Sequence, residues 1–243
     1  AGARLTHPLR LLWGSPGVDK SASRRAPLTR GAARGMAACM SDMPTRPSRN
    51  FYGRRHGKTL RPSQRGYLDG DLTTLRLPGV GWDDNPARAP LDLATIFPQA
   101  REVWLEIGFG GGEHMVAMAA RYPDIGLIGA EPFINGVSNL CKLIADDDLT
   151  NIRIWNDVAQ PLIAALPDAG LDRIYLLNSD PWPKKRHAKR RFIQQESLSQ
   201  LARILKPGGL LVMTTDHAAL AEWMWEQASA HSAFAAEAKT LDD

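Results

Sequence analysis

The sequence of 243 residues has few of the features that mark secreted, membrane or zinc-binding proteins. It contains two cysteines, Cys39 and Cys141. This number excludes a disulfide framework and fits a reducing compartment, so we expect a cytoplasmic protein. No Cys/His pair has zinc-site spacing, and we expect no metal. No apolar run approaches the roughly 20 residues of a membrane helix, so we expect no membrane partner.

Acidic residues are scarce at the beginning of the chain. Residues 1–58 contain 12 Lys or Arg but only two acids, Asp19 and Asp42, which gives a charge of +10. The whole chain carries +4, so the rest carries −6, although residues 184–191 alone contribute +6. Two focused basic patches on an otherwise acidic protein indicate a polyanionic partner, most simply nucleic acid.

The first hundred residues show little periodicity. Residues 1–48 are rich in Ala, Arg, Gly, Pro and Ser, which predicts a disordered extension, a leader or a misassigned start. Residues 49–68 are basic with interleaved aromatics, including Phe51 and Tyr52. We expect this segment either to touch RNA or to dock as an ordered segment. Residues 69–100 are rich in Pro and Gly and are predicted to be a connector.

Residues 101–243 alternate between strand and helix patterns. Met115, Met118, Ala119 and Tyr122, for example, recur at the spacing of one helix face. Strands are predicted within 103–112 (running into a glycine turn), 125–131, 152–157, 172–180 and 210–216. Helices are predicted at 113–122, 134–146, 161–166 and 192–205, and Lys-Pro-Gly-Gly at 206–209 is expected to form a turn. The alternation predicts an α/β fold with a doubly wound, mostly parallel sheet.

Carboxylates occur at the predicted carboxyl end of every strand. They are Glu106, Glu131, Asp157, Asp180 and Asp216. Any one of them could be a solvated loop residue or a helix cap, but five in register are harder to explain in that way. Because parallel strands end at one edge of the sheet, where such folds bind ligands, we expect a ligand site there.

The glycine turn indicates which ligand the site takes. Residues 108–112 read G-x-G-x-G, and Glu113 stands where a dinucleotide fingerprint needs Gly or Ala. A glutamate at the start of a helix would also repel a pyrophosphate. S-adenosylmethionine, which has an amino acid in place of the pyrophosphate, avoids this conflict. Glu131 is then placed for the ribose diol and Asp157 for the adenine amino group. The alternative is that the glycines only let strand and helix pack closely.

Five segments together resemble a known family. They read "RNFYGRRHGK", "LEIGFGGG", "GAEPF", "DPWPKKRHAKRR" and "KPGGLLVMTTD". In this order and spacing the chain resembles the bacterial tRNA (guanine-N7)-methyltransferase family from about residue 49 to 227. The D-P-W-x-K-x-R-H segment is the most specific. The resemblance implies a Rossmann-like class I methyltransferase domain over residues 101–243, with S-adenosylmethionine as methyl donor and the variable-loop guanine of tRNA as acceptor.

The resemblance also implies roles for individual residues. The positions that match the donor site are Glu106, Gly108, Gly110, Glu131, Asp157 and Asp180. Asp180 also matches the catalytic residue. The positions that match substrate or RNA contacts, with Trp182 added as a stacking surface, are Lys184, Arg186, His187, Lys189, Arg190, Arg191 and Asp216.

The chemistry of guanine fits these roles. Guanine N7 carries a free lone pair, so methyl transfer needs positioning but no general base. Asp180 could stabilise the positive charge that develops on the base, Trp182 could stack on a base, and residues 184–191 could grip phosphates. We expect His187 to contact phosphate or solvent, not to transfer protons. The alternative is that Pro-Trp-Pro is a packed turn followed by a solvated basic helix start.

Other features have simpler interpretations or depart from the family. Cys141, Trp223 and Met224 lie at helical spacing and are predicted to be packing residues. Asn178 and Ser179 stand where the family usually has Phe-Pro, which predicts an altered rate. The chain ends before two further strands and a Thr-x-Phe/Tyr-Glu segment of the family, so we expect the fifth strand to lack its outer neighbours.

Three hypotheses therefore remain for the function. The leading one is a tRNA guanine-N7 methyltransferase that acts as a monomer or homodimer. A second is a catalytically weak RNA-binding relative that keeps affinity for the donor. A third is a methyltransferase that acts on another amine.

Overall fold

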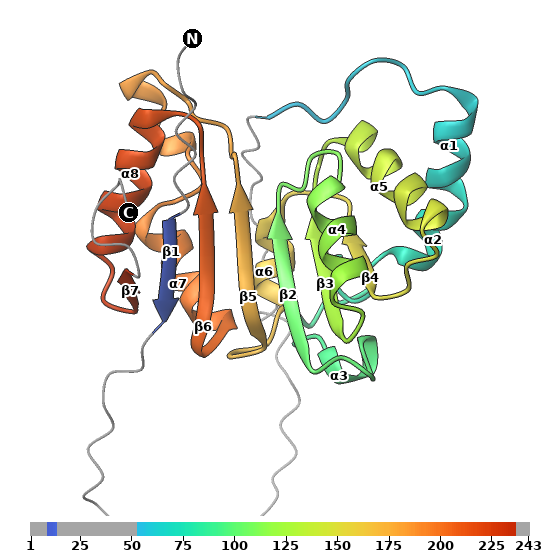
Figure 1. Ribbon diagram of the computed structural model, residues 1–243, viewed down its shortest axis with the longest axis horizontal. Coiled ribbons are helices and arrows are strands. Elements are labelled where there is room, and N and C mark those ends of the chain that lie inside the picture. The colour runs from blue at the N-terminus through green and yellow to red at the C-terminus, as the bar shows by residue number, and fades with distance from the viewer. Residues whose placement is uncertain (1–8, 14–52, 237–243) are drawn as a thin grey trace, which may run out of the picture.

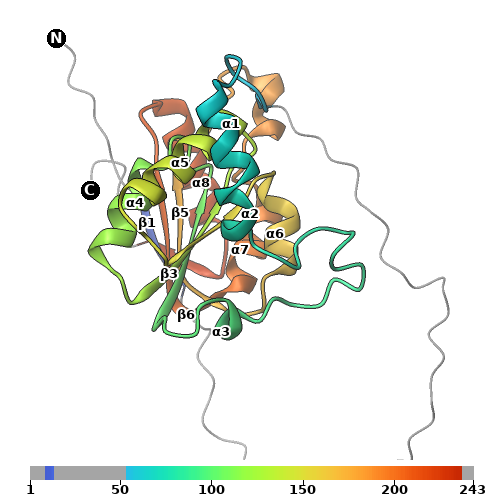
Figure 2. The same cartoon turned by 90° about the vertical axis from the view of Figure 1, so that its right-hand side faces the viewer.

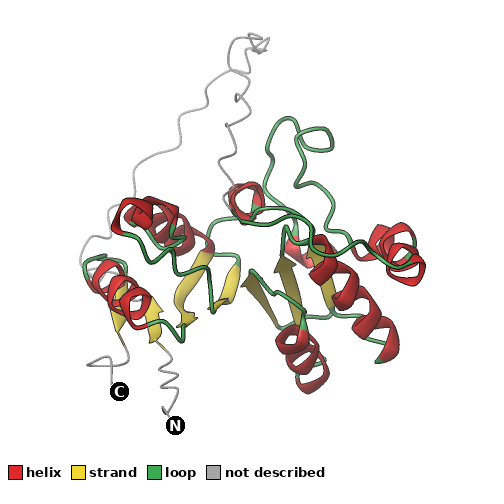
Figure 3. Ribbon diagram, turned by 90° about the horizontal axis from the view of Figure 1, so that it is seen from above, coloured by secondary structure: helices red, strands yellow, loops and turns green. Residues whose placement is uncertain are grey.

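The computed structural model describes residues 9–13 and 53–236, which form one sheet with helices on both of its faces (Figures 1 and 3). The sheet has seven strands in the order β4-β3-β2-β5-β6-β1-β7. The strands are β1 Leu9–Trp13, β2 Glu102–Ile107, β3 Ile125–Ala130, β4 Ile152–Trp155, β5 Leu171–Leu177, β6 Leu205–Thr214 and β7 Phe234–Ala236. The five strands β2 to β6 pair in parallel, which confirms the predicted α/β fold.

The helices form two layers around the sheet. They are α1 Pro62–Asp69, α2 Asp71–Leu75, α3 Leu93–Ile96, α4 Glu113–Arg121, α5 Ile134–Asp146, α6 Ala159–Ala165, η2 Lys185–Arg190 (a 3₁₀ helix), α7 Gln195–Ile204 and α8 Ala218–Ser229. One hydrophobic core joins α4 and α5 to the sheet, and the other joins α6, α7 and α8 to it. This arrangement buries β3 completely.

The helical periodicity correctly located the buried faces. In α4 the predicted residues Met115 and Ala119 are buried and Met118 and Tyr122 are half-buried, and in α5 the predicted packing residue Cys141 is buried. Apolar residues at i, i+3 and i+4 lie on one side of a helix. That side packs against the sheet because this removes the most apolar surface from water. Trp223 packs against the second core and Met224 lies inside it, as predicted.

The connector between α2 and β2 is more ordered than its composition indicates. Leu77 and Val80 are fully buried. The Leu77 N–H donates to the Ile154 carbonyl, so the segment pairs briefly beside β4. Figure 2 shows α1 and α2 alongside α5, with which both are in contact. The prediction of a connector over residues 69–100 therefore missed the short helices α2 and α3 and a share of the core.

The Lys-Pro-Gly-Gly segment does not form the predicted separate turn. It lies inside β6, where the register with β5 jumps between the pairs Leu171–Leu205 and Arg173–Leu210. The segment is thus a bulge that keeps both its ends paired. Lys206 within it contacts the Asp172 carboxylate at 2.8 Å. Strand β6 is therefore longer than predicted.

The outer side of β6 is covered, contrary to expectation. Strand β1 pairs antiparallel with β6, and β7 pairs antiparallel with β1. Pairing satisfies the backbone N–H and C=O groups that an exposed edge would leave open. The sheet therefore does not stop at its fifth parallel strand. Residues 9–13 form a strand although their segment was predicted to be disordered, and the rest of residues 1–48 lies outside the described residues.

Candidate functional site

The predicted site residues converge at one edge of the sheet. The turn after β2, the loop after β3, the end of β4 and the loop after β5 all lie at the carboxyl ends of parallel strands. This is the upper edge of the sheet in Figure 1. The Gly108 N–H donates to the Ala130 carbonyl, and the Glu131 N–H donates to the Trp155 carbonyl. The backbone thus ties the first three of these strand ends together.

The glycine turn has one open part and one packed part. Gly108 and Gly110 have positive φ angles of 74° and 57°, and a methyl group added at either would meet nothing within 4 Å. At Gly112 an added methyl group would lie 2.7 Å from Leu140 of α5. The close-packing interpretation therefore holds at Gly112, whereas the donor site at Gly108 and Gly110 stays a prediction. Gly112 allows close packing, whereas Gly108 and Gly110 expose backbone to open space that a ligand can enter.

Glu131 organises the turn from below. Its carboxylate accepts hydrogen bonds from the Gly110 and Phe133 N–H groups, each at 2.9 Å, and its residue is only 8% exposed. Burial raises the pKa of Glu131, the two N–H donors oppose this rise, and the negative charge of Asp180 adds to it. Two of the predicted acids, Glu131 and Asp180, therefore lie within electrostatic reach of each other.

Glu106 has a partner that the sequence did not reveal. The residue is 3% exposed, and its carboxylate lies 2.7 Å from His114 Nδ1 in the first turn of α4. The His114 ring meets the Tyr175 ring edge-on, at 4.9 Å between centroids. A buried carboxylate needs such a partner. Glu106 thus faces α4, and the histidine in the first turn of that helix was a signal that the sequence offered.

Asp157 is joined to the basic arm, which we define as residues 53–61. The Arg55 guanidinium lies 2.8 Å from the Asp157 carboxylate. Nearby, the Gly57 N–H donates to the Asn135 side chain, which in turn donates to the Lys58 carbonyl. The described part of the arm is therefore an ordered segment docked on the start of α5. Phe51 and Tyr52 lie outside the described residues.

The loop after β5 holds Asp180 on the surface between two unusual backbone positions. Asn178 and Trp182 both adopt left-handed φ angles, 51° and 41°. Asparagine tolerates this region, whereas for tryptophan it costs on the order of 1–3 kcal/mol. Asp180 itself is exposed. The loop therefore presents one carboxylate to solvent on a backbone that something else must hold in place.

The cationic run that follows is not uniform. Residues 185–190 form the 3₁₀ helix η2, in which Lys185, Arg186 and Lys189 are exposed, as is Lys184 before it. Arg191 is different. It is 9% exposed and its side chain donates to the carbonyls of Pro181 and Trp182. The predicted RNA contact of Arg191 stays a prediction, but in this structure the guanidinium contacts carbonyls of the protein's own loop, unlike the exposed cations before it.

The ring of Trp182 already has neighbours in this structure. The Arg190 guanidinium lies 4.9 Å from the ring centroid, and His187 meets the ring edge-on at 5.8 Å. Desolvation and the charges of Arg190, Arg186 and Lys184 lower the pKa of His187. His187 is therefore mostly neutral at pH 7. A base stacking on Trp182 would have to share or replace the place of Arg190.

The remaining predicted residues have clear positions. Asp216 is exposed just beyond β6, the strand next to the one that leads to Asp180. Cys141 is buried in α5, and burial raises the pKa of its thiol to about 12, so the thiol stays protonated and unreactive. Within residues 53–236 and 9–13 no cluster of His, Cys, Asp and Glu could hold a metal, and no helix is long and apolar enough to cross a membrane.

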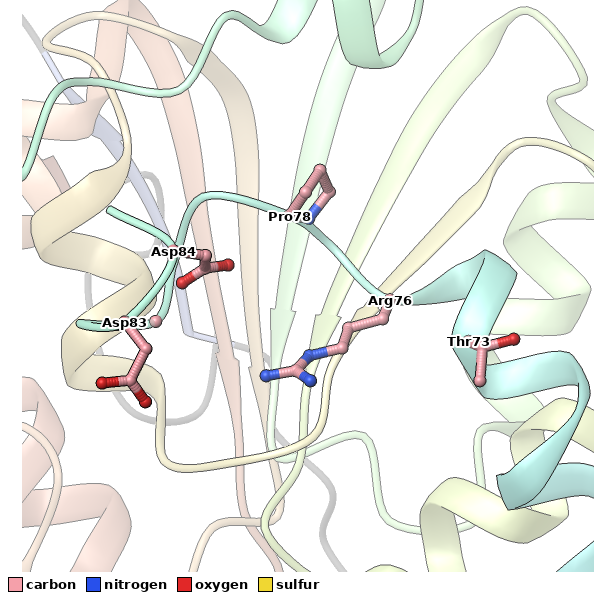
Figure 4. Close-up of a pocket in the computed structure, with 6 residues that line it drawn as sticks. Thr73, Arg76, Pro78, Asp83 and Asp84 are labelled. Atoms are coloured by element: carbon pink, nitrogen blue, oxygen red, sulfur yellow. The ribbon is translucent and has the colours of Figure 1, made fainter. Parts of the chain in front are cut away.

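The described residues form two surface pockets, one of them beside the basic arm. One pocket, of about 280 Å³, is lined by residues 56–60, Arg65, Ile134 and Asn135. The other, of about 380 Å³, is lined by residues between Thr73 and Asp84 and shares no residue with the predicted site. Figure 4 shows that the Arg76 side chain extends across this second pocket toward the side on which Asp83 and Asp84 lie.

Comparison with known proteins places the chain. A family model described as "Putative methyltransferase" matches residues 100–243. The tRNA (guanine-N(7)-)-methyltransferase of Paracoccus denitrificans is 54% identical over 173 residues, which are 71% of this chain and 74% of that protein. The chain belongs to the tRNA (guanine-N(7)-)-methyltransferase family. The family member from Rhodospirillum rubrum is 43% identical over 196 residues, 80% of this chain and 75% of that protein.

The likeness to solved structures is weaker than the likeness in sequence. A precorrin-6y C5,15-methyltransferase from Geobacter metallireducens superimposes with a TM-score of 0.45 at 17% identity, over 55% of this chain and 64% of that protein. Membership of the tRNA (guanine-N(7)-)-methyltransferase family therefore rests on sequence, and it confirms the resemblance seen in the five motifs.

Proposed function

We propose that this protein transfers a methyl group from S-adenosylmethionine to N7 of a variable-loop guanine in tRNA. The observation that carries the proposal is the pairing of an open glycine turn with an exposed acid. Gly108 and Gly110 border free space, Asp180 lies within electrostatic reach of Glu131 beneath that turn, and an exposed cationic run follows Asp180. One edge of the sheet thus offers a donor site, a site for the base and a site for the RNA backbone.

The residues at the turn fit the proposed donor. Gly108 and Gly110 would let the ligand approach the backbone, Glu131 would accept hydrogen bonds from ribose hydroxyls, and Asp157 lies at the end of β4, where adenine would be met. When bound, S-adenosylmethionine supplies a methyl group on a positively charged sulfur. Glu106 is buried on His114, so we propose that it acts by shaping the turn from beneath.

Asp180 is the proposed catalytic residue. Guanine N7 needs no base to remove a proton, but the ring becomes positively charged as the methyl group arrives. An exposed carboxylate on a fixed loop can stabilise that charge and hold the edge of the base. Asn178, which replaces the family's usual phenylalanine, suits the left-handed backbone at that position. The departure from the family is therefore compatible with an ordered loop.

The exposed cations would bind the tRNA backbone. Lys184, Lys185, Arg186 and Lys189 lie on the surface beside Asp180 and carry no sequence information of their own. They would place the nucleic acid so that one base reaches the carboxylate. A tRNA substrate also implies action in the cytoplasm, and a monomer or homodimer remains our expectation, which sedimentation of the purified chain would measure.

A single reaction tests the proposal. Purified protein is incubated with unmodified tRNA and labelled S-adenosylmethionine, and the labelled nucleoside is identified after digestion. We expect N7-methylguanosine, with Asp180→Asn slowing turnover by about 100-fold, because the charge that opposes the developing cation is lost. Label on an exocyclic amine would instead support the alternative acceptor. No label above the Asp180→Asn control would favour a binding protein.

A further inference from the structure

Two neighbouring arginines at the end of the cationic run have different environments. Arg190 is half-buried and lies over the Trp182 ring, whereas Arg191 is more deeply buried. Among the described residues Arg191 makes no ion pair with a carboxylate. A buried cation without a counterion is costly unless other groups compensate it. The position of Arg191 therefore demands an explanation other than solvation.

Three contacts compensate the buried charge. Arg191 Nε donates to the Pro181 carbonyl at 3.1 Å, and Nη2 lies 3.4 Å from the Trp182 carbonyl. The guanidinium also lies over the Trp223 ring, 5.1 Å from its centroid, where the face of the ring attracts a cation. Trp223 is itself fixed, because its indole N–H donates to the Ile193 carbonyl at 2.7 Å. The loop after β5 is thus fastened to α8 through Arg191.

The two carbonyls belong to the most constrained part of the loop. Trp182 has a φ of 41° and precedes Pro183, a combination that is sterically disfavoured. Pro181 joins Asp180 directly to the anchored carbonyl, and the proline ring leaves it no freedom in φ. Few rotatable bonds therefore separate the anchor from the Asp180 carboxylate. A loop in this conformation needs a restraint, and Arg191 supplies one.

We infer that Arg191 is a positioning residue, which holds Asp180 and Trp182 in the geometry for methyl transfer and does not contact the tRNA. The inference rests on the proposed function for its catalytic consequence. Its structural part, the restraint of the loop, holds whatever the substrate is. The cationic run thus contains exposed residues for the RNA backbone and one buried residue for the loop.

Two substitutions at this position separate the roles of charge and shape. Arg191→Met keeps an unbranched stem on Trp223 but removes the donors. Arg191→Lys keeps the charge, yet one ammonium cannot reproduce the planar fork that reaches two carbonyls and stacks on a ring. The matched control is Lys189→Ala, two residues away in η2 and exposed.

The first measurement is hydrogen exchange of the peptide that contains residues 178–184, in the free protein. Arg191→Met should speed exchange by about 10-fold, because the loop loses its anchor. Lys189→Ala should leave it unchanged. This measurement needs neither tRNA nor turnover, so its failure would contradict the restraint itself, whereas failure to methylate tRNA would contradict the proposed function. If Arg191→Met does not fold, Arg191→Lys decides the point on the same measurement.

The second measurement compares turnover with RNA binding. Arg191→Met should lower kcat by about 10- to 100-fold, as expected when a reacting group is displaced by about 1 Å. The affinity for the donor and the salt dependence of tRNA binding should not change. Arg191→Lys should lose most of the same activity. Two results would overturn the inference and make Arg191 a phosphate contact. One is a salt dependence of tRNA binding that weakens in Arg191→Met as it does in Lys189→Ala. The other is full turnover in Arg191→Lys.

Discussion

At the scale of single residues, the site depends on buried polar side chains that hold exposed ones. Glu131 binds two N–H groups beneath the glycine turn, Glu106 binds His114, and Arg191 binds two carbonyls of the Asp180 loop. Each buried group satisfies backbone or ring donors and acceptors that would otherwise be left without partners. Asp180, the residue that would contact the substrate, is exposed, and the loop that carries it is held by one of these buried groups, Arg191.

The burial of Glu131 predicts a pH-dependent contribution to stability. Its raised pKa means that the folded protein keeps this proton to a higher pH than the unfolded chain does. Folding therefore becomes less favourable as the pH rises from the unfolded pKa, about 4.3, through the folded pKa. Glu131→Gln lacks this proton, so its free energy of unfolding should rise relative to that of the native chain over the same interval.

Urea denaturation at pH 4, 5.5 and 7 would measure this difference. Glutamine can accept only through one oxygen, so the variant also loses an acceptor, and the effect of the two N–H donors on the native carboxylate is already part of its net pKa shift. The slope of the difference is therefore the test. A constant difference would show that the two N–H donors cancel the effect of burial on the pKa, and a change in the opposite direction would show that they outweigh it.

At the scale of the elements, the start of helix α5 packs directly against the backbone of the glycine turn. A methyl group added at Gly136, in the first turn of α5, would lie 2.0 Å from the Gly110 carbonyl oxygen. That oxygen belongs to the backbone and cannot rotate away. Gly136→Ala should therefore push α5 from the turn, lower the free energy of unfolding by about 1–3 kcal/mol and weaken donor binding.

The chain offers a matched control for this prediction. Gly66 lies within α1, and a methyl group added there would meet nothing within 4 Å. Gly66→Ala should stabilise the protein by about 0.5–1 kcal/mol, since alanine favours a helix more than glycine does. Thermal denaturation and calorimetric titration with the donor would compare the two. Equal effects of both substitutions would contradict a special role for the contact between Gly136 and Gly110.

The elements themselves were largely predictable. The strand and helix patterns of residues 101–216 gave the correct order and the correct buried faces, because local periodicity decides which side of an element can leave water. Helices α1 and α2 and the strand β1 were not predicted. Their short sequences carry little periodic signal, and they are stabilised by contacts with α5 and β6 that lie far away in the chain.

At the scale of the whole molecule, positive charge is concentrated where the tRNA would bind. The protein outside its first 58 residues is acidic, yet Lys184, Lys185, Arg186 and Lys189 form an exposed basic patch beside Asp180. Replacing these four residues by alanine should weaken tRNA binding, because fewer counterions are released from the RNA.

The salt dependence measures this effect directly. The slope of log Kd against log salt should fall by about 0.7–0.9 for each phosphate contact that is removed. Arg121→Ala, at the opposite end of α4 from the glycine turn, should leave the slope unchanged. Binding curves between low and moderate salt, with the same tRNA, would show both results. An unchanged slope in the fourfold variant would place the RNA on another surface.

The sequence alone determined the parallel α/β sheet, the acids at its strand ends and the family, because these depend on local periodicity and on short contiguous motifs. It could not tell Arg191 from its neighbours, find His114 beneath Glu106, or foresee the strand that covers β6. Those features depend on which distant segments pack together. Only the tertiary structure decides which of several similar cations meets two carbonyls and an indole ring, and which ones remain in water.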